Sequence, residues 1–562
     1  MPVFTSTPVT QAVEGSAYTY KLTTTGGVVT YAMTNAPTDA TLSGDTISWI
    51  PTAAQSRTSN GFTATATTPS GTSASQSWTV TPNGTVRISR VDTLWNESGS
   101  TDRPFDWSRI SSYVVALVPQ PDGSFISLSG TASTNGVFEI PNVPAGYYWL
   151  RLGPNDTYWT STSTFDLGGD YFEANATAPA PANSTTTFNF SFTSLDPTAG
   201  NGWLQFSTPE FTPLQYSGST AAGSTSFTGS MKIGGNVDFS AMRNAFAMQY
   251  EPTTFGSVDG YTLGPELTLT NMSLMTGGAN TISGSLNPTV LASINLSVEG
   301  SAWAPLLDHV SPSAPTAVGG GFYASVQPYI AADGANVAWS APINLLATLP
   351  VTSPAFVLGP TTCFGQSPNL PPALRTDMEA GTVQYSDPFP ATWRRTFDVC
   401  MEASVDVSVP GTGTTQSIVL ANDQTTSLPT EMVKPMISPV QNPRINGADI
   451  FTANTIKSTA LTLSWEPPTI GTPIGYQVEI MSPTTAPSGL PFYGFLARLS
   501  TAKTTMTLPP GLLGSGHTYL FIITSLVDGS ANMETSPHRS LLPVAQANLI
   551  SAPLTIGTVQ SN

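Results

Sequence analysis

Four short segments between Leu461 and Leu526 decide the fold class of this chain. They are Leu461-Thr-Leu-Ser-Trp465-Glu-Pro-Pro468, Gly475-Tyr476-Gln-Val-Glu-Ile480, Leu508-Pro-Pro-Gly511 and His517-Thr-Tyr519-Leu-Phe-Ile-Ile523. The segments are apolar or alternate between apolar and polar residues, and proline and glycine separate them, which is typical of short β-strands joined by turns. The stretch therefore predicts a β-sandwich near the C-terminus.

The order of these residues resembles a fibronectin type III domain. That family has a Trp on an early strand, a Tyr on the next, and a Leu roughly ten residues before a Tyr that opens a late strand. The resemblance covers residues 431–562, which begin with a proline-rich lead from Pro435 to Pro443. It implies a sandwich module and identifies no activity.

Residues 1–82 form a first predicted unit. It contains Gly15-Ser-Ala-Tyr18-Thr-Tyr20, then Thr46-Ile-Ser-Trp49-Ile-Pro51-Thr, and closes on two strictly alternating segments that end at Thr67 and Val80. Alternation predicts strands with one buried and one exposed face. The unit resembles the immunoglobulin-like repeat of bacterial surface proteins, in which the same opening and the same Ile-x-Trp-x-Pro-Thr strand recur.

Residues 83–195 form a second predicted unit around Gly136-Val-Phe138-Glu-Ile140-Pro-Asn-Val-Pro144-Ala-Gly146. Gly136 is expected to allow a tight hairpin, Phe138 and Ile140 to point to the same face, and Pro144 to Gly146 to reverse the chain. The segment resembles the carboxypeptidase-regulatory-like, or prealbumin-like, β-sandwich. That resemblance implies a non-catalytic module without peptidase zinc ligands.

The middle of the chain, residues 196–430, matches no motif. Many segments alternate with period two, which predicts one or two further β-domains but does not choose between a barrel, a sandwich and a β-helix. Residues 239–250 are the only helical candidate. The expected fold class is all-β, with tandem sandwiches around this larger β-rich region.

Composition restricts the partners. The 562 residues carry 35 acidic and 18 basic side chains, for a net charge of −17. This balance argues against nucleic acid and anionic membrane, which attract clustered Lys and Arg. No apolar run approaches the ~20 residues of a membrane helix. The polar start at Met1 leads us to expect that any leader is absent from this chain. The low Lys content and the high Thr and Ser content lead us to expect a secreted or cell-surface bacterial protein.

Sites for chemistry are scarce. The three His residues lie in separate segments, and none of the usual metal, phosphate or hydrolase motifs occurs. No cofactor, metal or catalytic residue is therefore predicted, although paired carboxylates for glycoside hydrolysis would leave no sequence motif. Cys363 and Cys400 are candidates for one disulfide, worth about 3–4 kcal/mol in a chain-entropy model; two buried thiols are the alternative.

Aromatic residues crowd the end of the second unit. Tyr148, Tyr158 and Trp159 are candidates for rings that face a ligand such as a sugar. Filling the core is the favoured alternative, because aromatic strands are common in sandwiches.

These features predict a non-enzymatic structural or adhesin-like protein that presents binding surfaces on stacked sandwiches. Its expected partners are other proteins or a surface polysaccharide, and exposed edge strands would also permit self-association. The alternative is an extracellular carbohydrate-binding accessory protein or glycan-active enzyme, with its site in residues 196–430.

Overall fold

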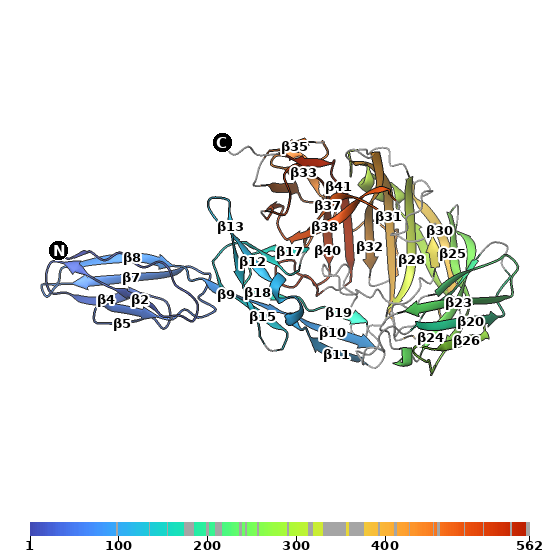
Figure 1. Ribbon diagram of the computed structural model, residues 1–562, viewed down its shortest axis with the longest axis horizontal. Helices are drawn as coiled ribbons and strands as arrows, with labels where there is room; N and C mark the ends of the chain where they lie inside the picture. The colour runs from blue at the N-terminus through green and yellow to red at the C-terminus, as the bar shows by residue number, and fades with distance from the viewer. Residues whose placement is uncertain are drawn as a thin grey trace. The chain divides into compact units, whose positions relative to one another are not determined.

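The computed structural model describes the chain apart from residues 97–98, 134, 154, 173–184, 198–201, 208–215, 235–238, 242–243, 256–257, 289–290, 309, 313–318, 330–355, 359–375, 390, 392–393, 410–412, 426–427, 453, 458–460, 488, 510, 540–541 and 558–562. It forms two compact units. Unit 1 comprises residues 1–90 and 104–167, and unit 2 comprises residues 91–103 and 168–562. Strands dominate both units (Figure 1).

The first sandwich of unit 1 has two facing three-stranded sheets, β2-β6-β5 and β4-β7-β8, with a small β1-β3 pair beside them. Its strands are β1 (Val3–Phe4), β2 (Tyr18–Lys21), β3 (Thr24–Thr25), β4 (Thr30–Asn35), β5 (Thr41–Ser43), β6 (Thr46–Trp49), β7 (Asn60–Thr67) and β8 (Ser73–Val80).

Aromatic rings fill the core of this sandwich. The Phe62 ring is stacked on Trp78, with centroids 5.3 Å apart, and Trp49 meets it edge-on at 5.5 Å. Tyr18 stacks on Phe62 at 5.7 Å, and its hydroxyl accepts a hydrogen bond from Trp78 Nε1 at 3.1 Å. The alternating pattern of the sequence places all four rings on inward-facing positions. The Tyr18 hydroxyl and Trp78 Nε1 have hydrogen-bond partners there, whereas Trp49 Nε1 has none among the described residues.

The second sandwich of unit 1 pairs β14-β15-β9-β18 with the sheet β13-β12-β16-β17. Gly136 has φ +75°, and a Cβ there would lie 2.4 Å from Arg90 O, so this hairpin needs glycine. Phe138 and Ile140 are both fully buried. Its elements are β9 (Gly84–Ser89), η1 (Trp107–Arg109), η2 (Ser111–Tyr113), β12 (Val115–Pro119), β13 (Phe125–Ser129), β14 (Thr131–Ala132), β15 (Val137–Val143), β16 (Tyr148–Arg151), β17 (Asp156–Thr160) and β18 (Thr164–Asp166).

Unit 2 contains three small sheets, β11-β10-β19, β23-β20-β26 and β27-β30. The sheet β23-β20-β26 contributes Phe188, Phe190 and Phe192 to a core shared with β21 and β24. The elements up to η4 are β10 (Val91–Asn96), β11 (Gly99–Pro104), β19 (Asp170–Phe172), β20 (Thr185–Thr193), β21 (Gly202–Ser207), β22 (Tyr216–Thr220), β23 (Ser226–Gly234), η3 (Phe239–Ala241), β24 (Ala245–Phe255), β25 (Val258–Leu269), β26 (Ala279–Ser285), β27 (Leu291–Val298), α1 (Gly300–Trp303) and η4 (Ala304–Leu307).

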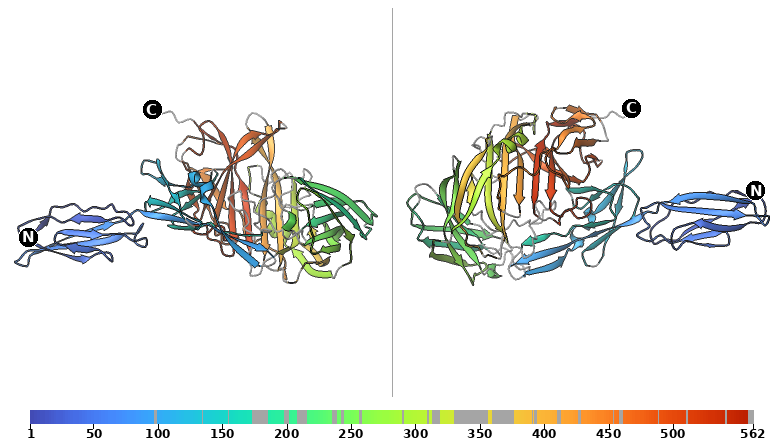
Figure 2. Two further views of the ribbon diagram at one scale, coloured as in Figure 1. Left: turned by 60° about the horizontal axis from the view of Figure 1, so that its bottom comes forward. Right: turned by 180° about the vertical axis from the view of Figure 1, so that it is seen from behind.

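One antiparallel ladder then runs through the rest of unit 2, in the order β22, β21, β24, β25, β29, β28, β31, β32, β41, β40, β37 and β38. Figure 2 shows these strands, green to red, as a broad sheet. The remaining elements are β28 (Gly319–Tyr329), β29 (Phe356–Leu358), β30 (Met378–Ser386), β31 (Arg394–Val409), β32 (Gly413–Thr425), β33 (Gln441–Ile445), β34 (Ala448–Asp449), β35 (Asn454–Ile456), β36 (Thr462–Glu466), β37 (Gly475–Thr485), β38 (Pro491–Thr501), β39 (Thr505–Thr507), β40 (Thr518–Asp528), β41 (Val544–Ile550) and β42 (Leu554–Ile556).

The predicted fold class is confirmed: the chain is all-β, with tandem sandwiches. Two details of the sequence analysis need correction. Residues 239–250 are not a helix, because only a 3-10 turn at Phe239–Ala241 precedes strand β24. The second concerns β20, which precedes the boundary predicted after residue 195 but pairs with β23 and β26 and lies in unit 2.

Candidate functional site

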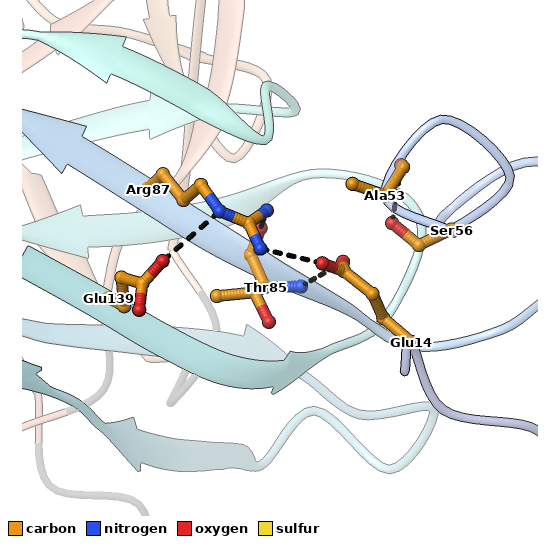
Figure 3. Close-up of polar contacts among 6 residues, drawn as sticks. All are labelled: Glu14, Ala53, Ser56, Thr85, Arg87 and Glu139. Carbon is orange, nitrogen blue, oxygen red and sulfur yellow. Dashed lines mark hydrogen bonds and ion pairs between the residues drawn. The ribbon is translucent and has the colours of Figure 1, made fainter. Parts of the chain in front are cut away.

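The two sandwiches of unit 1 meet at a joint formed by Glu14, Arg57, Gly84, Arg87 and the turn at residues 144–146. Near Glu14, the chain runs beside the start of β9, where Glu14 N donates to Asn83 O at 2.9 Å. The Glu14 carboxylate accepts hydrogen bonds from Thr85 N at 2.9 Å and from Arg87 Nη2 at 2.7 Å. Arg87 Nε lies 3.1 Å from Glu139 Oε1 of β15, so the guanidinium bridges two carboxylates (Figure 3).

This bridge holds Glu14 in its charged form. Burial by itself would raise the pKa of Glu14, but the hydrogen bonds from Thr85 and Arg87 outweigh it and keep the pKa below its ordinary value. The hydrogen bond to Glu14 in turn raises the pKa of Arg87. Because the pKa of Glu14 is lowered on folding, its contribution to the joint is present at neutral pH and is lost as the pH falls through that lowered pKa.

Arg57 forms the second half of the joint. Its backbone has φ +57°, and its guanidinium reaches from the first sandwich to three carbonyl oxygens of the second. Nε donates to Pro144 O at 2.9 Å, Nη1 to Thr162 O at 2.6 Å and Nη2 to Gly146 O at 2.9 Å. The same group lies 5.0 Å above the centre of the Tyr148 ring. One side chain therefore contacts three carbonyl groups and one ring of the second sandwich at the same time.

Gly84 allows this close approach. A Cβ at Gly84 would lie 2.5 Å from Ser56 Oγ and 2.9 Å from Arg57 Cγ. We expect Gly84→Ala to push the loop at residues 52–57 away from β9 and to cost about 1–3 kcal/mol, the usual range for overpacking. Hydrogen exchange at the Thr85 amide in the intact chain measures the effect.

The matched control is Gly153→Ala, because a Cβ at Gly153 would meet nothing within 4 Å. Equal exchange rates at Thr85 in the two variants would show that close packing at Gly84 does not hold the joint.

Two of the three candidate ligand-facing rings fill the core instead, which was the favoured alternative. Tyr148 and Tyr158 are each only 1% exposed, so neither ring faces a ligand. Tyr148 lies beneath Arg57 and donates its hydroxyl hydrogen to Thr162 O at 2.8 Å, and burial raises its pKa. Tyr158 packs edge-on against Phe165 at 5.1 Å. Trp159 is half-buried against Tyr147 and Trp149, with centroids 5.6 and 5.0 Å away.

Paired carboxyls do occur in the middle region. Burial, reinforced by the charge of Asp196 and a hydrogen bond to it, raises the pKa of Glu251 to about 7. The two carboxyls interact, and the negative charge of Asp196 disfavours ionisation of Glu251.

The other predictions concern cysteine, metal and membrane. Cys400 is fully buried in β31 and is disulfide-bonded, which disagrees with the alternative of a free thiol at this position. Its predicted partner, Cys363, lies outside the described residues. Within the described part of the chain, no group of three or more His, Cys, Asp or Glu side chains could hold a metal ion. None of the helices described there is long and apolar enough to cross a membrane.

Sequence reasoning missed the joint. Glu14 and Arg87 are 73 residues apart, and Arg57 is 87 residues from Pro144, so no local pattern links them. The one feature of the sequence that could have drawn attention to Arg57 and Arg87 is the rarity of basic residues, since the whole chain has only 18 Lys and Arg residues.

Comparisons with known proteins supply no family. No family model and no curated protein matches the chain. Among solved structures, it is similar to the N-terminal eight Ig domains of Down syndrome cell adhesion molecule, at 8% identity over 99% of this chain and 72% of that one, with a TM-score of 0.14.

Two further structures are similar at the same level. One is a Bacteroides ovatus mixed-linkage glucan utilization protein, SGBP-B, in complex with a heptasaccharide (11% identity, 69% and 97% coverage, TM-score 0.14). The other is protocadherin gamma B2 extracellular cadherin domains 3–6 (11%, 75% and 98%, TM-score 0.16). TM-scores this low carry no argument about function, which has to come from the molecule itself.

Proposed function

We propose that the chain is a non-enzymatic structural or adhesin-like protein of the cell exterior, which presents binding surfaces on rigidly connected β-sandwiches. The joint of unit 1 is the observation that carries this proposal. A flexible linker would let two sandwiches move independently. Here Arg57 makes three hydrogen bonds across the joint, and the Glu14–Arg87–Glu139 bridge lies beside it. Such a connection suits a protein that holds a surface at a fixed distance and orientation.

The order of strands near the C-terminus supports a fibronectin type III-like module as part of this assembly. The sheets β34-β33-β36-β39 and β38-β37-β40-β41 carry the expected residues on the expected strands. Trp465 contacts Tyr476 at 5.2 Å, and the Tyr519 hydroxyl accepts a hydrogen bond from Gly514 N at 2.7 Å. A tyrosine hydroxyl bonded to backbone a few residues upstream is a feature of this class of sandwich.

The partners fitting this proposal are other proteins or a neutral surface polysaccharide, because the net charge of −17 disfavours polyanions. Self-association through an edge strand is a variant of the same function.

A glycan array combined with a reducing-end assay tests the proposal on the intact chain. We expect no release of reducing ends from any polysaccharide. Hydrolysis that disappears in Glu251→Gln but persists in Glu379→Gln, an exposed control on β30, would replace the structural proposal with the enzymatic alternative.

A further inference from the structure

Strand β13 is an uncovered edge of the second sandwich of unit 1. It lies at the edge of the sheet β13-β12-β16-β17, and β12 is its only strand partner in the described part of the chain (Figure 1). Every residue of β13 is at least partly exposed, and the Ile126 side chain is 50% exposed. An edge of this kind offers a row of backbone N–H and C=O groups to another strand.

The β12–β13 hairpin determines which backbone groups of β13 point away from β12. Gln120 N donates to Ser124 O at 2.8 Å, so these two residues form a hydrogen-bonded pair in register with the ladder. Hydrogen-bonded and non-hydrogen-bonded pairs alternate along antiparallel strands. The register therefore bonds Ile126 and Leu128 to β12. It turns the backbone groups of three residues to the open side: Phe125, Ser127 and Ser129.

The β13 edge lacks the features that protect other edges of this chain. Charged side chains, proline and bulges usually keep an edge strand from pairing. Edge strand β4 has a bulge between Met33 and Asn35, and β23 carries the exposed Lys232. In contrast, β13 reads Phe-Ile-Ser-Leu-Ser, without charge or proline, and its register with β12 is continuous. Because the chain has a net charge of −17, two copies can approach each other with less repulsion at this neutral edge than at an acidic surface.

We propose that two copies of this chain pair through their β13 strands, antiparallel and about a two-fold axis at Ser127. Phe125 of each copy then lies opposite Ser129 of the other. The outward-facing residues meet as hydrogen-bonded pairs, so each N–H on this side meets a C=O. Ile126 of each copy lies opposite Leu128 of the other, in a non-hydrogen-bonded pair, where side chains are closest. The pairing therefore also covers the exposed apolar surface of Ile126.

This inference rests on the proposed function, because the pairing needs copies that are held side by side. Five residues on each strand cover too little surface for a stable dimer, which buries about 1,200 Å² or more. We therefore expect monomers in dilute solution. Copies anchored close together reach effective concentrations in the millimolar range, where a weak contact of this kind is populated.

A disulfide cross-link tests the register of the pairing. In the proposed dimer, the Cα atoms of the two Ser127 residues are about 5.5 Å apart, within the range that a disulfide spans. We expect Ser127→Cys in the full chain to form a disulfide-linked dimer under mild oxidation at high protein concentration, with wild type as the background.

Ser129→Cys is the matched control for the cross-link. The two Ser129 residues are offset by about 13 Å along the paired strands, which a disulfide cannot span. This variant should give at least about tenfold less linked dimer than Ser127→Cys. Equal yields from the two variants, or no linked dimer from Ser127→Cys, would overturn the proposal.

Small-angle X-ray scattering of the full chain tests the pairing without an added cysteine. Proline at position 127 removes an outward N–H and no bond to β12, so Ser127→Pro should keep the hairpin. As the concentration rises toward the millimolar range, we expect the average mass to rise for wild type and for Ser127→Ala, which keeps the N–H. Ser127→Pro should stay monomeric.

Two results of the scattering experiment would contradict the pairing: wild type that stays monomeric at every concentration, or a dimer that Ser127→Pro leaves intact. The reducing-end assay on the same protein tests the proposed function separately. Loss of the pairing alone therefore leaves that function standing, whereas hydrolysis would remove the function whatever the oligomeric state.

Discussion

Replacing Phe62 with alanine is expected to lower the free energy of unfolding of the first sandwich by about 3–5 kcal/mol. The ring is 1% exposed and contacts Tyr18, Trp49 and Trp78 with centroids 5.3–5.7 Å away. Its removal would leave a cavity among rigid rings that cannot collapse onto one another. Hydrogen exchange of the amides in β7 and β8, in urea and in the intact chain, reports this sandwich separately from the rest.

Tyr31→Ala is the control for this prediction. Tyr31 is half-buried at the rim, where its ring lies 6.2 Å from that of Phe4. We expect a cost of about 1 kcal/mol, in line with an average substitution. Equal losses in the two variants would mean that the ring cluster around Phe62 does not hold the sandwich together.

Glu402→Gln is expected to stabilise unit 2 at pH 8 by about 3 kcal/mol, because folding raises the pKa of Glu402 from 4.5 to about 7 and one pKa unit corresponds to ~1.4 kcal/mol. Glu402 is 3% exposed on β31, and burial raises its pKa to about 7. Its Oε2 has no hydrogen-bond partner among the residues that the structure describes. Ionisation at this position is therefore unfavourable in the folded chain.

The direction of the pKa shift decides whether stability rises or falls with pH. The pKa of Glu402 is raised on folding, so its favourable contribution is present below its unfolded pKa near 4.5 and is lost as the pH rises through about 7. Wild type should lose stability over that window, whereas Glu402→Gln should lose less. Thermal unfolding at pH 4.5 and pH 8 measures the difference, with Glu379→Gln as the exposed control. A gain of the same size at both pH values would rule out the titration of Glu402 as the cause.

Local patterns predicted the strands well where one face is buried. On β36, the buried Leu463 and Trp465 alternate with partly or fully exposed residues, as predicted. Strand β37 is also present, although its residues from Gly475 to Val478 are all buried. In the middle region, the alternation of apolar and polar residues continues from Leu267 to Leu274, but β25 ends at Leu269 and Asn271 adopts φ +53°. A polar turn residue with a left-handed backbone ended the strand despite continued alternation.

Long-range pairing escaped prediction for a different reason. Residue 430 was a reasonable boundary, because proline-rich sequence follows it, yet β32 pairs with β41 more than 100 residues later and joins the two regions in one sheet. Neither strand carries a mark that identifies its partner. The joint of unit 1 was hidden in the same way, since Arg57 belongs to no motif and Tyr148 was expected either to face a ligand or to fill the core.

The distance distribution between the two sandwiches of unit 1 tests the central claim most directly. Nitroxides coupled to noncanonical residues at positions 19 and 127, both exposed, leave the native cysteines untouched in the full chain. Pulsed electron–electron double resonance should give one narrow distribution of nitroxide–nitroxide distances for wild type. Lys21→Ala, which removes only an exposed ion pair, should give the same narrow distribution. Arg57→Ala should broaden it, because losing charged hydrogen bonds across the joint costs about 2–4 kcal/mol. A broad distribution in wild type, or one that Arg57→Ala leaves narrow, would contradict a rigid joint built on Arg57.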